Sequence, residues 1–418
     1  MGCFQRALAL FEGLGDRRGV MSSIIGLAHA NWGPAIHFYG AAQRLEDLRR
    51  LSTRFRSFTT ESERATAEAQ MIYGVQVFAL AKGAYDLALS RGEDGYRAAR
   101  AIGDRSLEFL TAGRVALAHL VLGEITEAEA WLQRAADAAA AAPTPTRAWR
   151  LEVWRGLARA AADDPRGMQA HFRRALEQAA EQGRPADRCE TLAELALAAA
   201  RLGATAGGGA LLTAAENAAN EAQALAAMLP GHAPWGPQAG AALALVHLAR
   251  GRAEDVATTA EGALQALDAS RHDDLPVAIV VAASRALLST GDEQVKLRTR
   301  ARLAALVTMV AQRTVDDAVR ARFFCGPLGR ELAALGASEP SALAEGTPDG
   351  ATHPTSSLDE DDSLLLGLLV EGRTNAEIAS RVGVAEDEVV RRLGRLFAKL
   401  AASSRAEATA FALRDGLV

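Results

Sequence analysis

The residues with the clearest binding chemistry are four basic side chains near the C-terminus: Arg391, Arg392, Arg395 and Lys399. They lie in residues 386–400, where apolar residues recur at helical spacing, so they form a cationic stripe along one helix. Guanidinium groups pair bidentately with guanine edges and with phosphates. The stripe is therefore a candidate site for a nucleic acid.

Residue types that serve catalysis or metal binding are sparse. Cys3, Cys189 and Cys325 lie far apart without a CxxC pair, which favours reduced, buried thiols over a disulfide framework. The eight histidines form no HExxH motif, and no lysine follows a glycine as a Walker A loop requires. No nucleophile–base pair stands out either. We therefore expect no enzymatic activity, no catalytic residue, no cofactor and no metal site.

Length and composition indicate a soluble helical protein. The chain has 418 residues, more than one domain of about 100–200 residues requires. It is 49% hydrophobic, 23% charged and only 5% aromatic, and the abundance of Ala, Leu, Arg and Glu favours helices. No run reaches ~18 apolar residues, and the N-terminus lacks a signal-peptide pattern. We therefore expect a cytoplasmic protein without membrane contact.

A repeat of about 40 residues runs from residue 1 to residue 336. The pattern Leu-x-His-Leu-x-x-Gly occurs at 117–123 and again at 245–251. Turn glycines recur at Gly40, Gly83, Gly123, Gly203, Gly251 and Gly291, and one repeat between Gly123 and Gly203 has lost its glycine, at Asp164. Helix–turn–helix units of this length bury their apolar faces only against each other. The period therefore predicts an α-solenoid.

This region resembles a degenerate tetratricopeptide (TPR) array, since residues 127–135 are similar to the second helix of such a repeat. The resemblance implies a concave surface that binds a protein or a small-molecule effector. Trp131, Trp154 and Trp235 either line that surface or anchor the core, and the core is favoured. The equivalent positions of His119 and His247 favour a packing role.

The chain divides into three parts. Residues 1–336 form the repeat domain, for sensing or interaction. Residues 337–357 contain three prolines, two glycines and no basic residue, which predicts a flexible linker. Residues 358–418 form a separate tail. Residues 4–15 are similar to a second repeat helix without its first, which predicts a fragment, a misplaced start or a truncation of a longer protein.

The tail predicts four short helices, at about 359–370, 374–382, 386–400 and 404–413. Capping boxes open the second and fourth of them, and Gly383-Val384 makes a tight turn between the second and third. Two helices joined by such a turn form a helix-turn-helix, whose second helix enters the DNA major groove. The predicted fold is therefore an all-α solenoid, a linker and a four-helix domain.

The tail closely resembles the LuxR/GerE-type DNA-binding domain. The matching stretches are residues 371–379, 382–384, 389, 397–400, 404–408 and 414–417. The resemblance implies that the third helix reads double-stranded promoter DNA and that the last helix supports a homodimer. Carried over residue by residue, base-facing positions fall on Val390, Arg391 and Gly394. Backbone contacts fall on Asn375, Glu388, Arg392, Arg395 and Lys399.

A second resemblance involves residues 324–332, which are similar to a segment of solenoid-bearing LuxR-type regulators. Many of these regulators carry an ATP-binding module before the repeats. We find no phosphate loop here, so either the module is missing or Met1 is not the native start.

The tail departs from the family at several positions. Val390 replaces a usual Lys, Glu388 a frequent Thr, and Ala385 the usual N-cap. Gly394 offers no side chain and costs ~1 kcal/mol inside a helix. Acidic residues exceed basic ones by three in residues 358–418. The acids at 386–388 either complement the helix dipole or repel phosphates.

Two functions remain open. The first is a transcriptional regulator whose solenoid senses an effector or partner and whose tail binds promoter DNA as a dimer. The second is a protein-interaction scaffold with a degenerate helix-turn-helix that serves only dimerisation.

Overall fold

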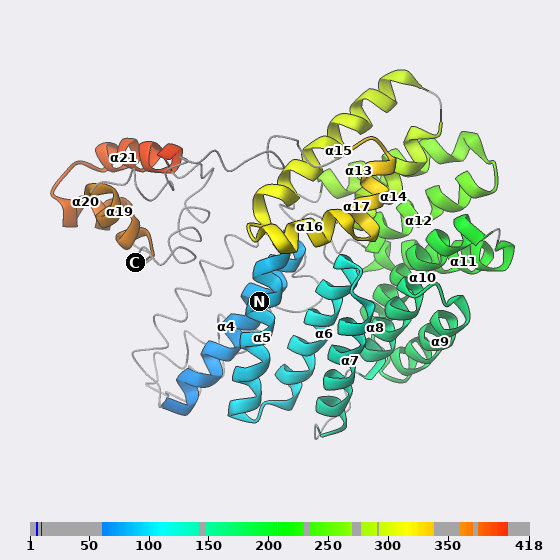
Figure 1. Ribbon diagram of the computed structural model, residues 1–418, viewed down its shortest axis with the longest axis horizontal. Helices are drawn as coiled ribbons and strands as arrows, with labels where there is room; N and C mark the ends of the chain where they lie inside the picture. Colours follow the sequence, from blue (N-terminus) through cyan, green and yellow to red (C-terminus); the bar gives the residue numbers. More distant parts are fainter. Residues whose placement is uncertain are drawn as a thin grey trace. The chain divides into compact units, whose positions relative to one another are not determined.

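The computed structural model describes residues 61–141, 148–206, 208–229, 235–269, 277–290, 292–337, 360–370 and 375–399, with Arg6 and Leu10. These residues contain helices and no strand, and they belong to two compact units (Figure 1). The prediction of an all-α fold with a TPR-like solenoid and a helix-turn-helix is confirmed. The predicted boundaries at 336 and 358 stay predictions, because residues 338–359 lie outside the described part.

The repeat unit consists of helices that follow one another in pairs. Their bounds are α4 (Glu61–Ala81), α5 (Tyr85–Ile102), α6 (Arg105–Leu122), α7 (Ile125–Ala140), α8 (Ala148–Ala161), α9 (Pro165–Glu181), α10 (Pro185–Ala206), α11 (Gly209–Met228), α12 (Trp235–Ala249), α13 (Ala253–Ala269), α14 (Val277–Leu288), α15 (Glu293–Arg313), α16 (Asp317–Cys325) and α17 (Pro327–Ala334). Each helix packs on its pair partner, and the first helices of successive pairs, α4 to α14, also touch. We call these contacting first helices the inner layer of the solenoid.

The turns within the pairs explain the 40-residue period. Gly83, Gly123 and Gly251 adopt left-handed backbone, with φ of 72°, 82° and 70°, which glycine tolerates best. In the pair α8–α9 this conformation belongs to Asp163, at φ 55°, 40 residues after Gly123. The predicted replacement at Asp164 was thus wrong by one residue. Asp164 instead caps α9, since its Oδ1 accepts a hydrogen bond from the Gly167 N–H.

Gly203 is not a turn residue, contrary to the prediction. It lies inside α10, where an added Cβ would come within 2.9 Å of Leu212 Cδ2 on α11. Its missing side chain therefore lets α10 and α11 approach closely. Gly40 and Gly291 lie outside the described residues.

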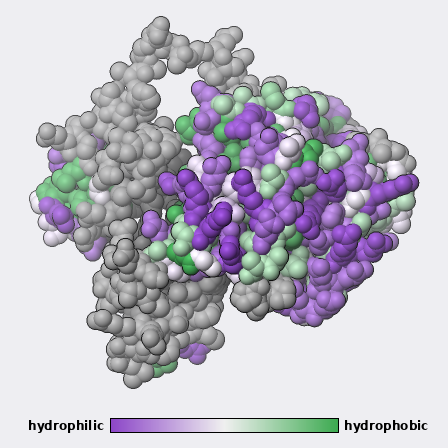
Figure 2. Space-filling view, turned by 60° about the horizontal axis from the view of Figure 1, so that its bottom comes forward, coloured by the Kyte–Doolittle hydropathy of each residue, from purple (hydrophilic) through white to green (hydrophobic). Residues whose placement is uncertain are grey.

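The three tryptophans that the sequence singled out are buried. Trp131, Trp154 and Trp235 are each less than a tenth exposed and belong to one hydrophobic cluster. Trp154 packs against Phe109 with ring centroids 5.1 Å apart. This agrees with their interpretation as core anchors. Figure 2 shows a mainly hydrophilic face over this unit.

The predicted packing role suits His119 better than His247. His119 Nδ1 lies 2.7 Å from Glu124 Oε2, whereas His247 Nδ1 lies 3.9 Å from Asp255. The thiols are free, but only Cys189 is buried; Cys325 is exposed because it ends α16. Cys3 lies outside the described residues.

The last helices of the repeat unit return to its first described pair. We call residues 314–334, with α16 and α17, the closing segment. Helix α16 contacts α5 and α6, and α17 contacts α6 and α14 (Figure 1). Thr314 Oγ1 donates a hydrogen bond to the Gly83 carbonyl, 2.9 Å away, and Phe323 stacks on Tyr85 at 5.0 Å.

The segment 324–332 that the sequence singled out belongs to this closure. An added Cβ at Gly326 would lie 2.8 Å from the Leu122 carbonyl oxygen, so its backbone approaches the end of α6. Leu328 and Leu332 are buried in the solenoid core. The segment therefore closes the described array onto itself.

Asp86 is the carboxylate that holds the start of the closing segment. Its Oδ2 accepts hydrogen bonds from the backbone N–H groups of Val315, at 2.8 Å, and Asp316, at 2.9 Å. We expect Asp86→Ala to lower the free energy of unfolding by ~1–3 kcal/mol, because two donors lose their acceptor. Urea unfolding followed by circular dichroism measures this. Glu93→Ala, which removes an exposed carboxylate from the same helix, is the control and should change it by less than ~0.5 kcal/mol.

The tail unit contains α19 (Glu360–Val370), α20 (Asn375–Val382) and α21 (Glu386–Lys399). These bounds agree with the first three predicted tail helices to within a residue. The fourth, at 404–413, and the cap residues 372 and 374 lie outside the described residues. None of the described helices in either unit is long and apolar enough to cross a membrane.

Candidate nucleic-acid interface

A tight turn sets the angle between α20 and α21. Gly383 adopts left-handed backbone, at φ 73°. The N–H groups of Gly383 and Val384 both donate to the Ala379 carbonyl, at 2.9 and 3.1 Å. These bonds satisfy the end of α20 as glycine-terminated helices commonly do. Three residues, 383–385, connect α20 to α21, which gives the helix-turn-helix connection.

The buried face of α21 fixes the direction of its opposite face. Val389, Leu393 and Leu396 are at most 5% exposed, and they pack with Leu366 of α19 and Ile378 of α20. Their spacing of three and four residues places them on one side of the helix. The polar residues between them are therefore presented to solvent.

Two arginines project from that solvent face. The side chains of Arg391 and Arg395 are 72% and 70% exposed, and they are four residues apart on α21. Side chains at this spacing are neighbours on a helix surface. The two arginines therefore form a cationic surface. It lies where the second helix of a helix-turn-helix presents side chains to the DNA bases.

Arg392 has a different position. It is 27% exposed, its Nε lies 3.1 Å from Glu388 Oε1, and its Nη1 lies 3.3 Å from Asp361 Oδ2 on α19. This arginine thus links α21 to the first helix of the tail. Its guanidinium therefore pairs with two carboxylates of its own domain.

Glu388 lies at the centre of the arginines. Its carboxylate is 2.9 Å from Arg391, 3.1 Å from Arg392 and 3.6 Å from Arg395. The hydrogen bond from Arg392, helped by the charges of Arg391 and Arg395, holds the pKa of Glu388 below its usual range. Glu388 therefore stays ionised and offsets part of the positive charge. Sequence reasoning missed this cluster, although spacings of three, four and seven residues along one helix are its signal.

The other predicted residues are only partly placed. Asn375 begins α20 and is partly buried. Val390, Gly394 and Lys399 lie within α21, but their side-chain surroundings fall outside the described part. The structure thus brings Glu388 together with Arg391, Arg392 and Arg395, and the contacts assigned to all eight residues stay predictions. In the described ranges, no three His, Cys, Asp or Glu residues gather as a metal site would require.

Comparison with known proteins finds sequence relatives of this part of the chain. Residues 357–412 match the GerE family, described as bacterial regulatory proteins of the luxR family. A stretch of 59 residues is 46% identical to the DNA-binding transcriptional activator DevR/DosR of Mycobacterium tuberculosis (strain ATCC 25618 / H37Rv). That stretch covers 14% of this chain and 27% of the relative, so the similarity spans about a quarter of the relative's length.

A solved structure resembles a larger part of the chain more weakly. It is the crystal structure of a Rap protein complexed with competence and sporulation factor, with a TM-score of 0.45 and 12% identity. The alignment covers 82% of this chain and 97% of the Rap chain. The family match, at residues 357–412, contains α19, α20 and α21 and every candidate residue on them. It follows the all-helical repeat region in the chain. Residues 357–412 therefore form a C-terminal domain that matches the GerE model of luxR-family bacterial regulatory proteins.

Proposed function

We propose that this protein is a DNA-binding transcriptional regulator in which α21 enters the major groove of promoter DNA. One observation carries the proposal: Arg391 and Arg395 project together from the face of α21 opposite its buried side. Arginines so placed reach guanine O6 and N7 and the flanking phosphates. The similarity to DevR/DosR, itself a DNA-binding activator, supports the same assignment.

Two further features belong to the proposal. The regulator binds as a homodimer, because one such domain reads a half-site and paired domains read two half-sites a helical turn apart. The repeat region senses an effector or partner and shifts the protein between arrangements that differ in DNA affinity.

Selection of full-length protein against a random duplex pool tests the proposal. We expect a sequence with two related half-sites to enrich, and fluorescence anisotropy to show an affinity that falls steeply with salt. Sedimentation of the complex gives the number of chains per duplex, and two are expected. Failure to enrich any sequence, with helical content confirmed by circular dichroism, would contradict DNA reading by the protein alone.

Glu388 should limit the strength of this interaction. We expect Glu388→Gln to raise DNA affinity roughly threefold to tenfold at low salt, because a carboxylate near the phosphates disappears and two arginines lose their internal partner. Anisotropy titrations on the selected duplex measure the change.

The matched control is Glu254→Gln, which makes the same charge change at an exposed position of α13 in the repeat unit. Its effect on affinity should be small. A weaker complex with Glu388→Gln would contradict the expectation and would assign Glu388 to orienting the arginines or to accepting from cytosine N4.

The scaffold function is the second candidate, and the same cluster favours it. Glu388 already neutralises part of the arginine charge, and the tail carries a net charge of minus three. A dimeric protein that enriches no duplex, with or without Glu388→Gln, would support this candidate.

A further inference from the structure

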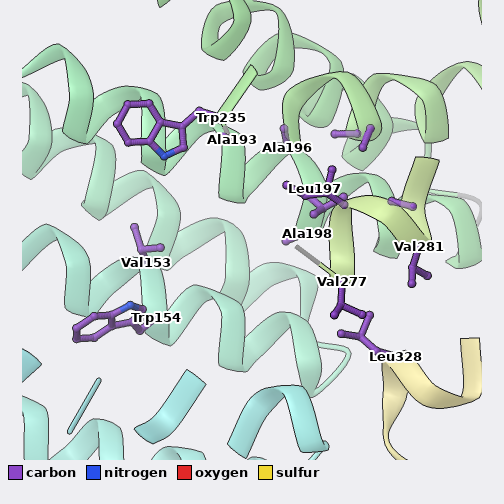
Figure 3. Packing of buried hydrophobic residues seen from close by; sticks show 14 of the residues in the cluster. Val153, Trp154, Ala193, Ala196, Leu197, Ala198, Trp235, Val277, Val281 and Leu328 are labelled. Carbon is purple, nitrogen blue, oxygen red and sulfur yellow. The ribbon is translucent and has the colours of Figure 1, made fainter. Parts of the chain in front are cut away.

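A cavity of about 670 Å³, partly open to solvent, lies in the repeat unit. Helices α6, α10, α12 and α14 of the inner layer and α17 of the closing segment contribute to its wall. Figure 3 shows Val277 of α14 beside Leu328 of α17, and it also labels Leu197 of α10. All three residues line the cavity and are less than a tenth exposed. The volume falls within the range of small-molecule sites, about 300–1,000 Å³.

The wall is apolar over most of its area. Aliphatic side chains and Trp235 line it, together with Tyr85, whose pKa is raised by burial. A hollow of this size with such a wall therefore suits a ligand with a hydrocarbon body.

Charged groups gather where α17 meets α10 and α14. Glu331 of α17 pairs with Arg201 of α10, and its Oε1 lies 3.7 Å from Arg285 of α14. That distance is too long for a hydrogen bond. In the described residues Oε1 of Glu331 has no hydrogen-bond partner, although it is buried. Two guanidinium groups thus share one carboxylate, and the Arg285 donors are not satisfied by it.

Taken together, the charged residues of the wall leave an excess of positive charge. Four arginines and three glutamates line the cavity: Arg114, Arg201, Arg285, Arg330, Glu190, Glu194 and Glu331. Glu190 is compensated by the buried Arg150, with an Nη2–Oε2 distance of 2.8 Å. Burial, followed by the charge of Glu190, raises the pKa of Glu194 to about 7, so this carboxyl is partly neutral near neutral pH. An anion is therefore favoured over a cation.

We propose that the cavity binds a small organic acid with an apolar body, whose carboxylate is held by Arg285 beside the Arg201–Glu331 pair. Guanidinium and carboxylate form charge-assisted, bidentate hydrogen bonds. Through Leu328, Pro327 and Glu331, the bound acid would touch the closing segment as well as the inner layer. The inference rests on the proposed function only in taking the repeat region as the sensing part.

Binding of straight-chain probes to the full-length protein tests this inference without DNA. Decanoate is the acid, and decylamine and decanol carry the same chain with a cationic or neutral head. We expect decanoate to bind in isothermal titration calorimetry and to raise the melting temperature, since a ligand that binds only the folded state stabilises it. No binding by decanoate or shorter carboxylates, or equal binding by decanol or decylamine, would overturn the inference.

Two variants locate the site. Arg285→Gln should weaken decanoate about tenfold or more, because a charge-assisted contact is lost. Leu117→Trp, which adds bulk to the wall without removing a charge, should also weaken it. The control Arg298→Gln removes an exposed arginine from α15 and should leave affinity unchanged. Unaltered binding by both cavity variants would place the acid elsewhere and refute the inference.

The pH dependence adds a further prediction. Glu194 accepts a hydrogen bond from Gln238 of α12 and faces the charges of Glu190 on α10 and Arg114 on α6. Its ionisation as pH rises from about 6 to about 8 adds a negative charge to the wall, so decanoate affinity should fall over this range. Glu194→Gln should flatten that dependence.

The test of the cavity site can be distinguished from the test of DNA binding. Decanoate binding that shifts DNA affinity in anisotropy titrations supports both proposals. Acid binding by a protein that selects no duplex supports the cavity site and contradicts the regulator.

Discussion

Replacing Arg391 and Arg395 together with alanine is expected to weaken binding to the selected duplex by ~100-fold or more. Each bidentate arginine–guanine contact contributes about 1–3 kcal/mol. Both side chains are mostly exposed, so their loss leaves the domain core intact. Where an arginine meets phosphate instead, the slope of log affinity against log salt should fall by about 0.9 for each lost contact. Anisotropy titrations at several salt concentrations measure both quantities.

The control is Arg97→Ala with Arg298→Ala. These arginines are as exposed as the pair on α21, at 74% and 68%, and they lie in the repeat unit. The control removes the same charge and should retain most of the affinity. An equal loss in both double variants would show that general electrostatic attraction, and not α21, carries the binding.

The second large effect is expected on stability, from adding one methyl group to the solenoid core by the substitution Gly113→Ala. An added Cβ at Gly113 on α6 would lie 1.9 Å from the Trp154 ring on α8. That ring is 3% exposed and is held against Phe109, so it cannot move aside without disturbing α6 and α8. Because overpacking of this kind costs about 1–3 kcal/mol and occasionally more, we expect Gly113→Ala to lower the free energy of unfolding by ~3 kcal/mol.

The same substitution at Gly262 makes a matched control. Gly262 lies in α13, and nothing stands within 4 Å of an added Cβ there. Alanine is the better helix former by about 1 kcal/mol, so Gly262→Ala should stabilise the protein. Chemical unfolding of both variants measures the change in the free energy of unfolding. If packing decides the result, this change is negative for Gly113→Ala and positive for Gly262→Ala. Destabilisation of similar size in both would refute the packing explanation.

The tail illustrates how much of the fold the sequence predicts. Helices α19, α20 and α21 begin and end within a residue of their predicted bounds, because helix starts, glycine turns and apolar spacing are local signals. The same signals place Gly83, Gly123 and Gly251 at the turns of their pairs. Gly203 follows the spacing equally well, yet it lies within α10, because close helix packing also selects glycine.

The side-chain contacts of the Glu388 cluster, the closing segment and the cavity could not be predicted from such local signals. The Glu388 cluster depends on side-chain rotamers, although its spacing is visible in the sequence. The closure needs Asp86 to meet Val315, and the cavity needs Arg285 to meet Glu331. Neither pairing follows from a local sequence pattern. Each depends on how strongly the described repeats curve before the closing segment meets α5 and α6.

The closing segment has a consequence for cooperativity. In an open solenoid each repeat contacts only its neighbours, so the ends can fray independently. Here hydrogen bonds join residues 229–231 positions apart in the sequence, and both described ends of the array are held. Opening one pair would release packing on both sides, so the helices from α4 to α17 should melt in a single transition. The closure also fixes the number of repeats between Asp86 and Val315, since a pair inserted there would separate Asp86 from the backbone it binds.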